Sequence, residues 1–355
     1  MARILIKNGR VWDGARFLHA DILTEGRSVS KIERHIFEHA DFTYDARGKL
    51  VSAGLVDAHM HMRGISSEEF GMQAEMSCFP FGVTAAADAG AGRGDKALLD
   101  SFLLKNAVFI EVPTEGNHAK LAEAQGRLSL YGDKAVGLKV YLDTTVSDVR
   151  DVTPLKEACE LARERGLRVM VHSSHSPVPM AELLGALDRG DILTHAFHGG
   201  ENNASLDGFC GMREAQSRGV FIDVGFAGHV HTDFGVLRAA IRAGVLPDLI
   251  STDITRYSAF TRGGRYGMTM CMSIARSLGM REEDILPAVT SRPAEALGKE
   301  AEWGCLAEGA RADIAVLDYT DAGFDLTDQA GNRVFDTVGY RCVLTVLDGQ
   351  IVYIN

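Results

Sequence analysis

The stretch VSAGLVDAHMHMRG (residues 51–64) opens the central part of the chain and shows how that part is built. Its apolar run Gly54–Asp57 has the length of a buried strand and leads directly to His59 and His61. A spacing of two residues places both imidazoles on the same side of an extended chain, where they can reach one cation. An HxH pair arises often by chance, but a pair at the end of a strand favours metal ligation. We expect Asp57 to orient this site rather than to bind the metal.

Seven further apolar runs of strand length follow, and stretches with helical periodicity separate them. One helix has Thr153 as its N-cap and Gly166 as its C-cap, and two more are expected at Met180–Arg189 and Phe234–Ala243. Buried strands that alternate with helices pair in parallel, so we predict an α/β fold, a (β/α)8 TIM barrel. An open, doubly wound sheet is the alternative, although no GxGxxG follows the first strand. The seven runs are Gly82–Ala87, Ala107–Val112, Ala135–Leu142, Leu167–Val171, Asp191–Thr194, Val220–Val224 and Leu249–Thr252.

Both ends of the chain have a different character from the middle. Short β-rich segments in the first fifty residues are separated by Asn8-Gly9, Asp13-Gly14 and Glu25-Gly26, pairs that are typical of hairpin turns. The last fifty residues repeat this pattern, with Asp348-Gly349 as a turn. We therefore predict a small β-sandwich domain formed by both termini, residues 1–52 with 304–355, around a barrel at 53–303.

The composition excludes several classes of partner. The 355 residues carry a net charge of −11, which argues against nucleic acid because its phosphate backbone needs a basic face. No apolar run reaches the roughly 18 residues that a membrane helix needs. Six widely spaced cysteines without a CxxC pair, and a strand-like start without a signal peptide, predict a reducing, cytoplasmic compartment. The sequence leaves a homo-oligomer open.

The positions of the histidines are the most informative feature. Nine of the twelve fall at predicted strand ends or in the loops after them, where a barrel carries its active site. His172 and His195 each end a strand, and each alone could be a core histidine bonded to the backbone. Their shared location with the HxH pair favours metal ligation instead. His175 and His198, three residues later, are expected to support the ligands or to face the substrate. The nine are His59, His61, His118, His172, His175, His195, His198, His229 and His231.

Two charged residues complete the predicted site. Lys139 lies inside the apolar run AVGLKVYL, and a lone ammonium in a buried strand is costly unless it is paired or chemically changed. It either forms a salt bridge or reacts with CO2 to give a carbamate that can bridge two metals. Asp253 follows the eighth run, where it suits a metal ligand and a proton shuttle. The alternative role for Asp253 is a helix N-cap.

With these residues in place, the sequence resembles the amidohydrolase superfamily over essentially its whole length. SRPAEALG (291–298) and GCLAEGARADIAVLD (304–318) resemble the superfamily's usual exit from the barrel. The likeness is greatest to deacetylase-type amidohydrolases that were often labelled dihydroorotase. The segments that carry it are GLKVYL (137–142), TPLKEACELARERG (153–166), MVHSSHSP (170–177), GDILTHAFHG (190–199) and ISTD (250–253).

The resemblance implies two divalent metal ions, usually zinc. His59 and His61 with Asp253 would hold the more buried ion, and His172 and His195 the more exposed one. Carboxylated Lys139 would bridge both. Such relatives act on N-acetyl amino acids or α-acetoxy carboxylates, so we expect a small-molecule substrate that carries a carboxylate.

Candidates for binding that carboxylate lie on predicted loops at the same end of the barrel, and arginine suits bidentate recognition of it. Arg63 gives an HxHxR motif, as in true dihydroorotases, and could equally form a structural ion pair. His198 stands where relatives often have asparagine, so the loop after the sixth strand is expected to recognise a different substrate. The candidates are Arg63, His118, His229, Arg256 and Arg262.

The predicted reaction is hydrolysis, in which Asp253 takes a proton from the attacking water and returns it to the leaving group. Hydrolysis of a cyclic amide, as in dihydroorotases and hydantoinases, is a second interpretation. A catalytically silent scaffold is a third, but such proteins typically lose metal ligands and all six candidates are present here. The motifs GxxxxGK[ST] and GxSxG are absent, which argues against P-loop and serine hydrolases.

Overall fold

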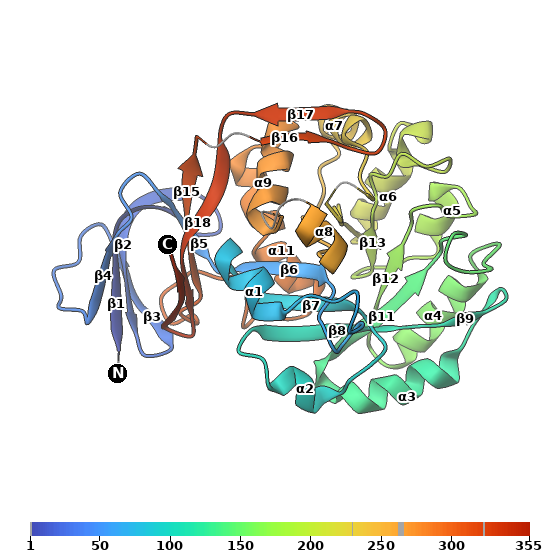
Figure 1. Cartoon of the computed structure of the whole chain (residues 1–355), viewed down its shortest axis with the longest axis horizontal. Helices are drawn as coiled ribbons and strands as arrows, with labels where there is room; N and C mark the ends of the chain where they lie inside the picture. The colour runs from blue at the N-terminus through green and yellow to red at the C-terminus, as the bar shows by residue number, and fades with distance from the viewer. Residues whose placement is uncertain (1, 229, 262–265, 322–323) are drawn as a thin grey trace.

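The computed structural model describes residues 2–228, 230–261, 266–321 and 324–355. A barrel forms most of the molecule, and a small β unit that contains both termini lies beside it (Figure 1). Within the described residues, no helix has the length and apolar character that crossing a bilayer requires. All six cysteines are free thiols.

The barrel sheet is parallel, as predicted. Its seven regular strands follow the order β14-β13-β12-β11-β8-β7-β6, so each strand lies beside its predecessor in the chain. Their interiors are almost entirely buried, which explains why each reads as a continuous apolar run. The strands are β6 (Leu55–Met60), β7 (Val83–Ala91), β8 (Lys105–Glu111), β11 (Ala135–Tyr141), β12 (Arg168–His172), β13 (Ile192–Thr194) and β14 (Phe221–Ile222).

The eighth predicted strand, 249–252, joins the ring without forming a regular strand. Leu249 makes an isolated parallel bridge to Asp223, and Ile254 makes one to Met60 on β6. The backbone N–H of Asp253 also donates to the carbonyl of His59 at 2.7 Å. This segment therefore closes the sheet between β14 and β6, which confirms the barrel and rules out the open, doubly wound sheet.

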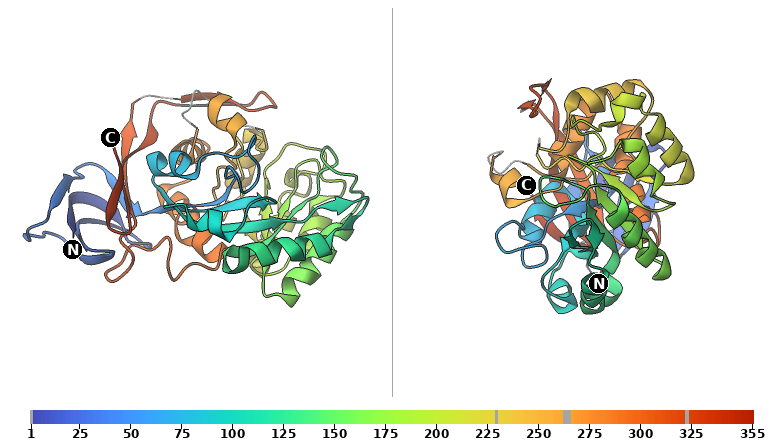
Figure 2. Two further views of the ribbon diagram at one scale, coloured as in Figure 1. Left: turned by 60° about the horizontal axis from the view of Figure 1, so that its bottom comes forward. Right: turned by 90° about the vertical axis from the view of Figure 1, so that its right-hand side faces the viewer.

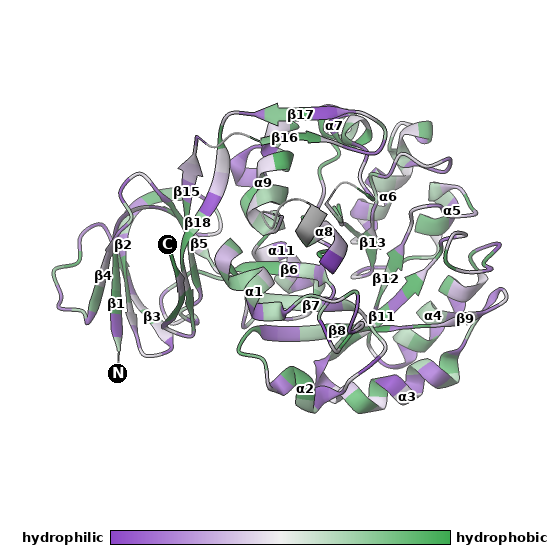
Figure 3. Ribbon diagram, viewed as in Figure 1, coloured by the Kyte–Doolittle hydropathy of each residue, from purple (hydrophilic) through white to green (hydrophobic). Residues whose placement is uncertain are grey.

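Helices surround the barrel strands. On α4, the residues that face the strands are apolar and buried, whereas the opposite face is charged. The helix begins one residue earlier than predicted, because Thr153 is its first residue and Val152 its N-cap. Figure 3 shows α3 with alternating hydrophilic and hydrophobic bands, as expected of a helix on the outside of a barrel.

The predicted helix at 180–189 is shorter than expected. It ends at Gly185, and the N–H of Asp188 donates to the side chain of Asp191, which turns the chain toward the next strand. The α-helices are α1 (Ala74–Cys78), α2 (Lys96–Asp100), α3 (Leu121–Tyr131), α4 (Thr153–Glu164), α5 (Met180–Gly185), α6 (Cys210–Arg218), α7 (Phe234–Arg242), α8 (Arg256–Thr261), α9 (Met268–Ser277), α10 (Glu282–Ala288) and α11 (Ser291–Ala296). Short 3-10 helices lie at Phe79–Phe81, Gly132–Lys134 and Ala204–Asp207.

Both ends of the chain build the small β unit, which confirms that prediction. Its sheet has the order β19-β18-β15-β5-β1-β2-β3, and β4 pairs with β1. Apolar residues from both termini share one core, for example Ile6 and Val11 with Val316 and Val346. The strands are β1 (Arg3–Trp12), β2 (Phe17–Glu25), β3 (Ser28–Glu33), β4 (Phe42–Asp45), β5 (Leu50–Ala53), β15 (Ile314–Thr320), β18 (Gly339–Leu347) and β19 (Gln350–Ile354).

The hairpin turn expected at Asn8-Gly9 was wrong. Strand β1 continues through this pair, and the register with β2 shifts there, so the two residues form a bulge. Asn8 has a φ of 61° and its N–H donates to Asp21. A Cβ on Gly9 would lie 2.6 Å from Cγ2 of Val51, so glycine permits the neighbouring strand to approach.

A second hairpin leaves the small β unit and reaches over the barrel. It consists of β16 (Phe324–Thr327) and β17 (Arg333–Asp336), which form a two-stranded sheet of their own within the described part of the chain. Figures 1 and 2 show it above α9 and near α7, on the side of the barrel away from α2 and α3. The short strands β9 (Thr114–Glu115) and β10 (His118–Ala119) form the remaining two-stranded sheet. The division into residues 1–52 with 304–355 and 53–303 stays a prediction, and this hairpin places part of the C-terminal segment against the barrel.

Candidate active site

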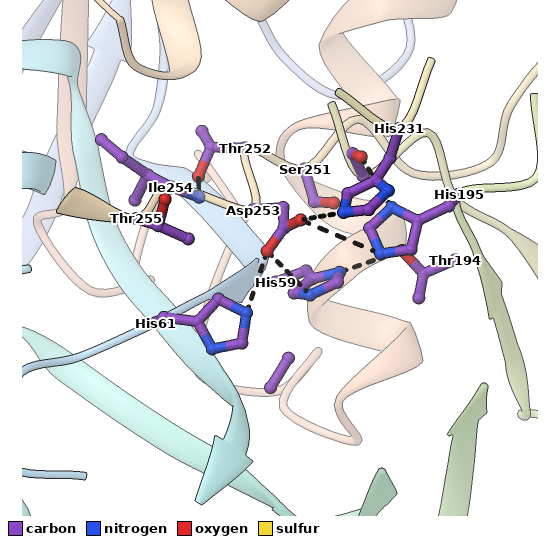
Figure 4. Close-up of polar contacts among 12 residues, drawn as sticks. His59, His61, Thr194, His195, His231, Ser251, Thr252, Asp253, Ile254 and Thr255 are labelled. Atoms are coloured by element: carbon purple, nitrogen blue, oxygen red, sulfur yellow. Dashed lines mark hydrogen bonds and ion pairs between the residues drawn. The ribbon is translucent and has the colours of Figure 1, made fainter. Parts of the chain in front are cut away.

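The ends of several barrel strands bring a dense group of histidines together (Figure 4). His59 lies near the end of β6 and His61 just after it, while His172 ends β12 and His195 follows β13. Asp253 comes from the closing segment between β14 and β6. All five are buried, and they lie at the end of the barrel where the sequence predicted a site.

Three of these residues form what we call the Asp253 cluster: His59, His61 and Asp253. Their ligand atoms lie within 4.8 Å of one another. Nε2 of His61 is 2.9 Å and Nε2 of His59 is 3.3 Å from Oδ1 of Asp253. Burial opposes ionisation of Asp253, but the two imidazoles outweigh it and hold the pKa of this carboxyl well below its usual range.

The other group, which we call the three-histidine cluster, consists of His172, His195 and His231. Their ligand atoms also lie within 4.8 Å of one another. The ring centroids of His195 and His231 are 4.2 Å apart, and those of His172 and His195 are 4.4 Å apart. Sequence reasoning placed His231 near a strand end but did not include it among the ligands. A second HxH motif, HVH at 229–231, was the signal that could have identified it.

Among the residues that the structure describes, each histidine of the three-histidine cluster forms a hydrogen bond with the protein through one ring nitrogen. Nε2 of His172 is 2.9 Å from Oδ2 of Asp143, and Nδ1 of His195 is 2.8 Å from the carbonyl of Gly225. Nδ1 of His231 is 3.1 Å from Oγ of Ser174. The second nitrogen of each ring remains for a metal ion, an arrangement typical of ligating histidines.

The protonation states also suit a metal site. Burial lowers the pKa of His172 to about 4 and that of His231 to about 3, so both are neutral at pH 7. A metal ion needs a neutral imidazole. Oδ1 of Asp253 is buried without a hydrogen bond of good geometry, although two nitrogens face it. The donor set therefore fits divalent cations in both clusters.

Lys139 is completely buried beside the Asp253 cluster. Its Nζ lies 3.3 Å from Nε2 of His59 and 3.5 Å from Sδ of Met170. Among the described residues no carboxylate lies within ion-pair distance of it, so the predicted salt bridge has no partner there. Burial lowers the pKa of Lys139 to about 8, so a sizeable fraction of its amine is neutral near pH 7 to 8.

His195 and Asp253 have strained backbone conformations, and a buried carboxylate holds the segment before Asp253. His195 has a φ of 59° and Asp253 a φ of 45°, conformations that residues other than glycine rarely adopt. Asp57 holds the segment before Asp253, because its carboxylate accepts the N–H of Thr252 at 3.1 Å and the hydroxyl of Thr252 at 2.6 Å. Asp57 thus holds the residue next to Asp253, and the role in orienting the site that we expected for it stays a prediction.

A pocket of about 270 Å³ borders the three-histidine cluster. Ser174, His175, His198 and His231 line it from the barrel. The tip of the β16–β17 hairpin forms another wall, through Gln329 and Ala330. His198 is buried and its Nδ1 accepts the N–H of Gly200 at 3.0 Å, whereas His175 is more exposed and lies 3.4 Å from Asp143. This volume is just below the range of about 300–1,000 Å³ that is usual for ligand sites.

The hairpin tip is anchored beside this pocket. Oδ2 of Asp328 accepts the N–H of Phe234 at the start of α7, at 2.6 Å. Nδ2 of Asn332 donates to Oδ1 of Asp233, the N-cap residue of α7, at 3.0 Å. These contacts join the C-terminal part of the chain to the active-site end of the barrel, a connection that the sequence did not predict.

The predicted carboxylate-binding residues are dispersed. Arg63 is exposed and its Nε lies 2.9 Å from Glu68, and His118 is exposed and pairs with Glu157 at 2.7 Å. Arg256 is exposed at the start of α8, three residues after Asp253. None of these three lines the pocket beside the three-histidine cluster. His229 and Arg262 lie outside the described residues.

Comparisons with known proteins find relatives along almost the whole chain. The profile of the amidohydrolase family matches residues 50–352. A deacetylase of Brucella anthropi is 29% identical over 90% of this chain and 86% of its own length. A deacetylase of Enterococcus faecalis is 27% identical over 98% of each chain. A dihydroorotase of an Anaeromyxobacter species is 26% identical over 99% of this chain and 98% of its own length.

A solved structure supports the same fold. The crystal structure of a dihydroorotase has a TM-score of 0.86 and 24% identity, covering 100% of this chain and 98% of its own. The match of the family profile extends from β5 into β19, across the whole barrel, the Asp253 cluster and the three-histidine cluster. The chain therefore belongs to the amidohydrolase family, as its sequence predicted, and it is a hydrolase.

Proposed function

We propose that this enzyme deacylates small substrates, with N-acyl amino acids or α-acyloxy carboxylates as the substrate class. The observation that carries this choice is the likeness to deacetylases, which spans 90% and 98% of the chain in two relatives. The small pocket beside the three-histidine cluster supports it, because its size suits a short acyl compound.

We infer that two divalent ions, most simply zinc, complete the site, because imidazole and carboxylate ligands suit that metal. His59, His61 and Asp253 would hold one ion. His172 and His195 would hold the other, with His231 as a further imidazole within reach. When bound, such ions polarise a carbonyl oxygen and lower the pKa of water.

Lys139 is proposed to carry a carbamate that bridges the two clusters. The neutral amine attacks the carbon of CO2, a C–N bond forms, the π electron pair of one C=O bond moves to its oxygen, and the nitrogen loses one proton to solvent. The buried amine with its lowered pKa of about 8 supports this step, because only the unprotonated form is a nucleophile. Carbon NMR after incubation with isotopically labelled bicarbonate tests it, with Lys139→Met as the control. A wild-type spectrum without a carbamate signal would refute the modification.

Asp253 is proposed as the proton shuttle. Its carboxylate faces both histidines of the Asp253 cluster, and His195 and His231 approach its other oxygen at 3.8 and 4.0 Å. Because its pKa lies below the usual range, the carboxylate is ionised and able to take a proton from the attacking water. It then returns that proton to the leaving nitrogen or oxygen.

The test compares N-acetyl amino acids, α-acetoxy acids and dihydroorotate side by side with metal-loaded protein. We expect the acyl compounds to be hydrolysed, and Asp253→Asn to lose at least about 100-fold in kcat/KM. Asp100→Asn, which changes an exposed carboxylate on α2, is the matched control and should keep full activity. Full activity of Asp253→Asn, or less than one equivalent of metal in active protein, would refute the mechanism.

A cyclic amide hydrolase is the second candidate, supported by the dihydroorotase relative that matches 99% of the chain. The HxHxR motif favours it, although Arg63 is paired with Glu68 in an exposed position. Faster turnover of dihydroorotate than of any acyl compound in the same assay would establish this function instead.

A further inference from the structure

Each histidine of the Asp253 cluster contacts a hydroxyl group that lies between its ring and a buried aspartate, and Nδ1 of His59 is also 3.7 Å from Oδ2 of Asp223. Nδ1 of His59 lies 2.9 Å from Oγ1 of Thr194, which in turn donates to Oδ2 of Asp223 at 2.7 Å. Figure 4 shows Thr194 next to His195, on the same side of His59. All three residues are buried, so no solvent competes for these contacts.

A second chain of the same kind reaches His61. Its Nδ1 lies 3.0 Å from Oγ of Ser66, and Ser66 donates to the carboxylate of Asp88 at 2.8 Å. Asp88 lies in β7, the neighbour of β6, whereas Thr194 and Asp223 lie at β13 and just after β14. The two histidines are thus tied to different parts of the barrel by equivalent arrangements of imidazole, hydroxyl and buried aspartate.

Each carboxylate is itself fixed in place. Oδ2 of Asp223 accepts a second hydroxyl, from Ser251, at 2.7 Å. Oδ2 of Asp88 accepts the N–H of Met62 at 2.6 Å. Because both carboxylates are anchored by other donors, the hydroxyls of Thr194 and Ser66 have a fixed acceptor to which they donate.

This geometry determines the tautomer of each imidazole. A hydroxyl has one proton to donate, and here that proton goes to the aspartate. The hydroxyl can then only accept from the ring, so Nδ1 carries the proton and Nε2 keeps its lone pair. The Nε2 atoms are the ones that face Asp253, where the inferred ion would lie.

We propose that Thr194 with Asp223, and Ser66 with Asp88, are positioning residues that fix His59 and His61 as Nδ1–H tautomers for metal binding. This inference rests on the metal site of the proposed function. Thr194 and Ser66 touch neither the substrate nor the ion; they act through the histidines. Outer partners of this kind typically change metal affinity by about 10- to 100-fold when they are removed.

Metal binding to the full-length, metal-free protein tests the proposal. Zinc is titrated in competition with a chromogenic chelator, for wild type, Thr194→Val and Thr194→Ser. We expect Thr194→Val to weaken one of the two ions by about 10- to 100-fold and Thr194→Ser, which keeps the hydroxyl, to bind like wild type. Ser66→Ala with Ser66→Thr forms the parallel pair. Wild-type affinity for both ions in Thr194→Val and in Ser66→Ala would overturn the proposal.

Nitrogen NMR of labelled histidine rings gives a readout that a merely structural role would not change. In metal-free wild type, His59 and His61 should carry their protons on Nδ1, and Thr194→Val should populate the other tautomer of His59. A wild-type proton on Nε2 overturns the proposal, whatever the metal affinity. If wild type binds no divalent ion, the metal assignment of the proposed function fails. The positions of the ring protons in His59 and His61 then still show whether the hydroxyls fix the tautomers. If wild type binds two ions and the variants bind them equally well, only the positioning role fails.

Discussion

The Asp253 cluster and the three-histidine cluster lie side by side at one end of the barrel, yet they differ in charge and in access. The first contains a carboxylate and two imidazoles, whereas the second contains imidazoles alone. All side chains of the first are at most 7% exposed, but the side chain of His231 in the second is 20% exposed and lines the pocket.

This difference indicates that the two clusters would hold a metal ion with different strength. A buried carboxylate neutralises part of a cation's charge, so the Asp253 cluster should retain its ion more firmly. The three-histidine cluster borders the pocket, so an ion held there would exchange more easily and would lie closer to a substrate bound in the pocket. The hydrogen-bond partners of the histidines also differ between the clusters. In the Asp253 cluster both histidines contact hydroxyl groups, whereas in the three-histidine cluster the partners are a carboxylate, a carbonyl and a hydroxyl.

The change expected to damage both clusters most is Gly225→Ala. Gly225 has a φ of 57°, and a Cβ there would lie 2.4 Å from Oγ1 of Thr194 and 2.6 Å from Nδ1 of His195. The clash displaces His195 in one cluster and the support of His59 in the other. We expect kcat/KM to fall at least about 100-fold, because displacements near 1 Å have that effect.

Gly116→Ala is the matched control for this change. Gly116 has the same φ of 57°, but nothing lies within 4 Å of its added Cβ. It should cost about 1 kcal/mol of stability and leave kcat/KM unchanged. Gly225→Ala with wild-type kinetics and two bound ions would show that the clusters tolerate displacement.

Removal of metal from the two clusters should proceed in two phases. A chelator should remove the ion of the three-histidine cluster first, at a rate about tenfold higher or more, because that cluster contains no aspartate ligand. His231→Gln should abolish the fast phase and keep the slow one, and His61→Gln should do the reverse. Inductively coupled plasma analysis of metal content during dialysis measures both phases.

His118→Gln serves as the control, since His118 is exposed and paired with Glu157 away from the pocket. A single phase in wild type, or loss of both ions in His231→Gln, would mean that the two clusters bind their ions as one unit.

The sequence predicted the parts of this site that depend on strand ends. His59, His61, His172, His195 and Asp253 each follow a run with strand periodicity, and parallel strands bring their carboxyl ends to one side. Lys139 was identified because a charge in a buried run is rare. These inferences need only the local pattern and the rule that parallel strands share one direction.

Other features depend on long-range packing that local pattern does not encode. His231 lies in a loop, where periodicity gives no direction, and Thr194 and Ser66 belong to residue types that are common everywhere. The hairpin at 324–336 was placed in the small β domain because the whole segment 304–355 was assigned to that domain. Only its tertiary contacts with Asp233 and Phe234 show that it borders the pocket.

The pH dependence of stability should separate the two clusters in metal-free protein. Between about pH 6.5 and about pH 4, the unfolded chain protonates His172 while the folded chain, with its pKa lowered to about 4, does not. The free energy of unfolding therefore falls as the pH falls through this range. Asp253, whose pKa is lowered, stabilises above its ordinary pKa near 4, and that contribution is lost only in more acidic solution.

Thermal unfolding of chelator-treated protein measures this effect. We expect Tm to fall by at least about 2 °C between pH 6.5 and pH 4.5, and the fall to shrink in His172→Gln. His19→Gln, which changes an exposed histidine of β2, should keep the wild-type slope. A Tm that stays constant over this range would mean that the histidines of the three-histidine cluster are not buried as neutral groups.

The smallest effect is expected from the hairpin tip, which borders only the three-histidine cluster. Ala330→Trp adds an aromatic ring to the wall of a pocket of about 270 Å³. The KM for substrates with bulky side chains should rise, and this rise should be about tenfold larger than the rise in the KM for N-acetylglycine. Small steric changes in a pocket discriminate between substrates by about this factor. Metal content should not change, because the tip contacts α7 rather than the ligands.

Thr327→Trp on the same hairpin, outside the pocket, should leave both KM values unchanged. Equal KM ratios in the two variants would show that substrates do not reach the hairpin and that access to the three-histidine cluster is set by the barrel loops alone.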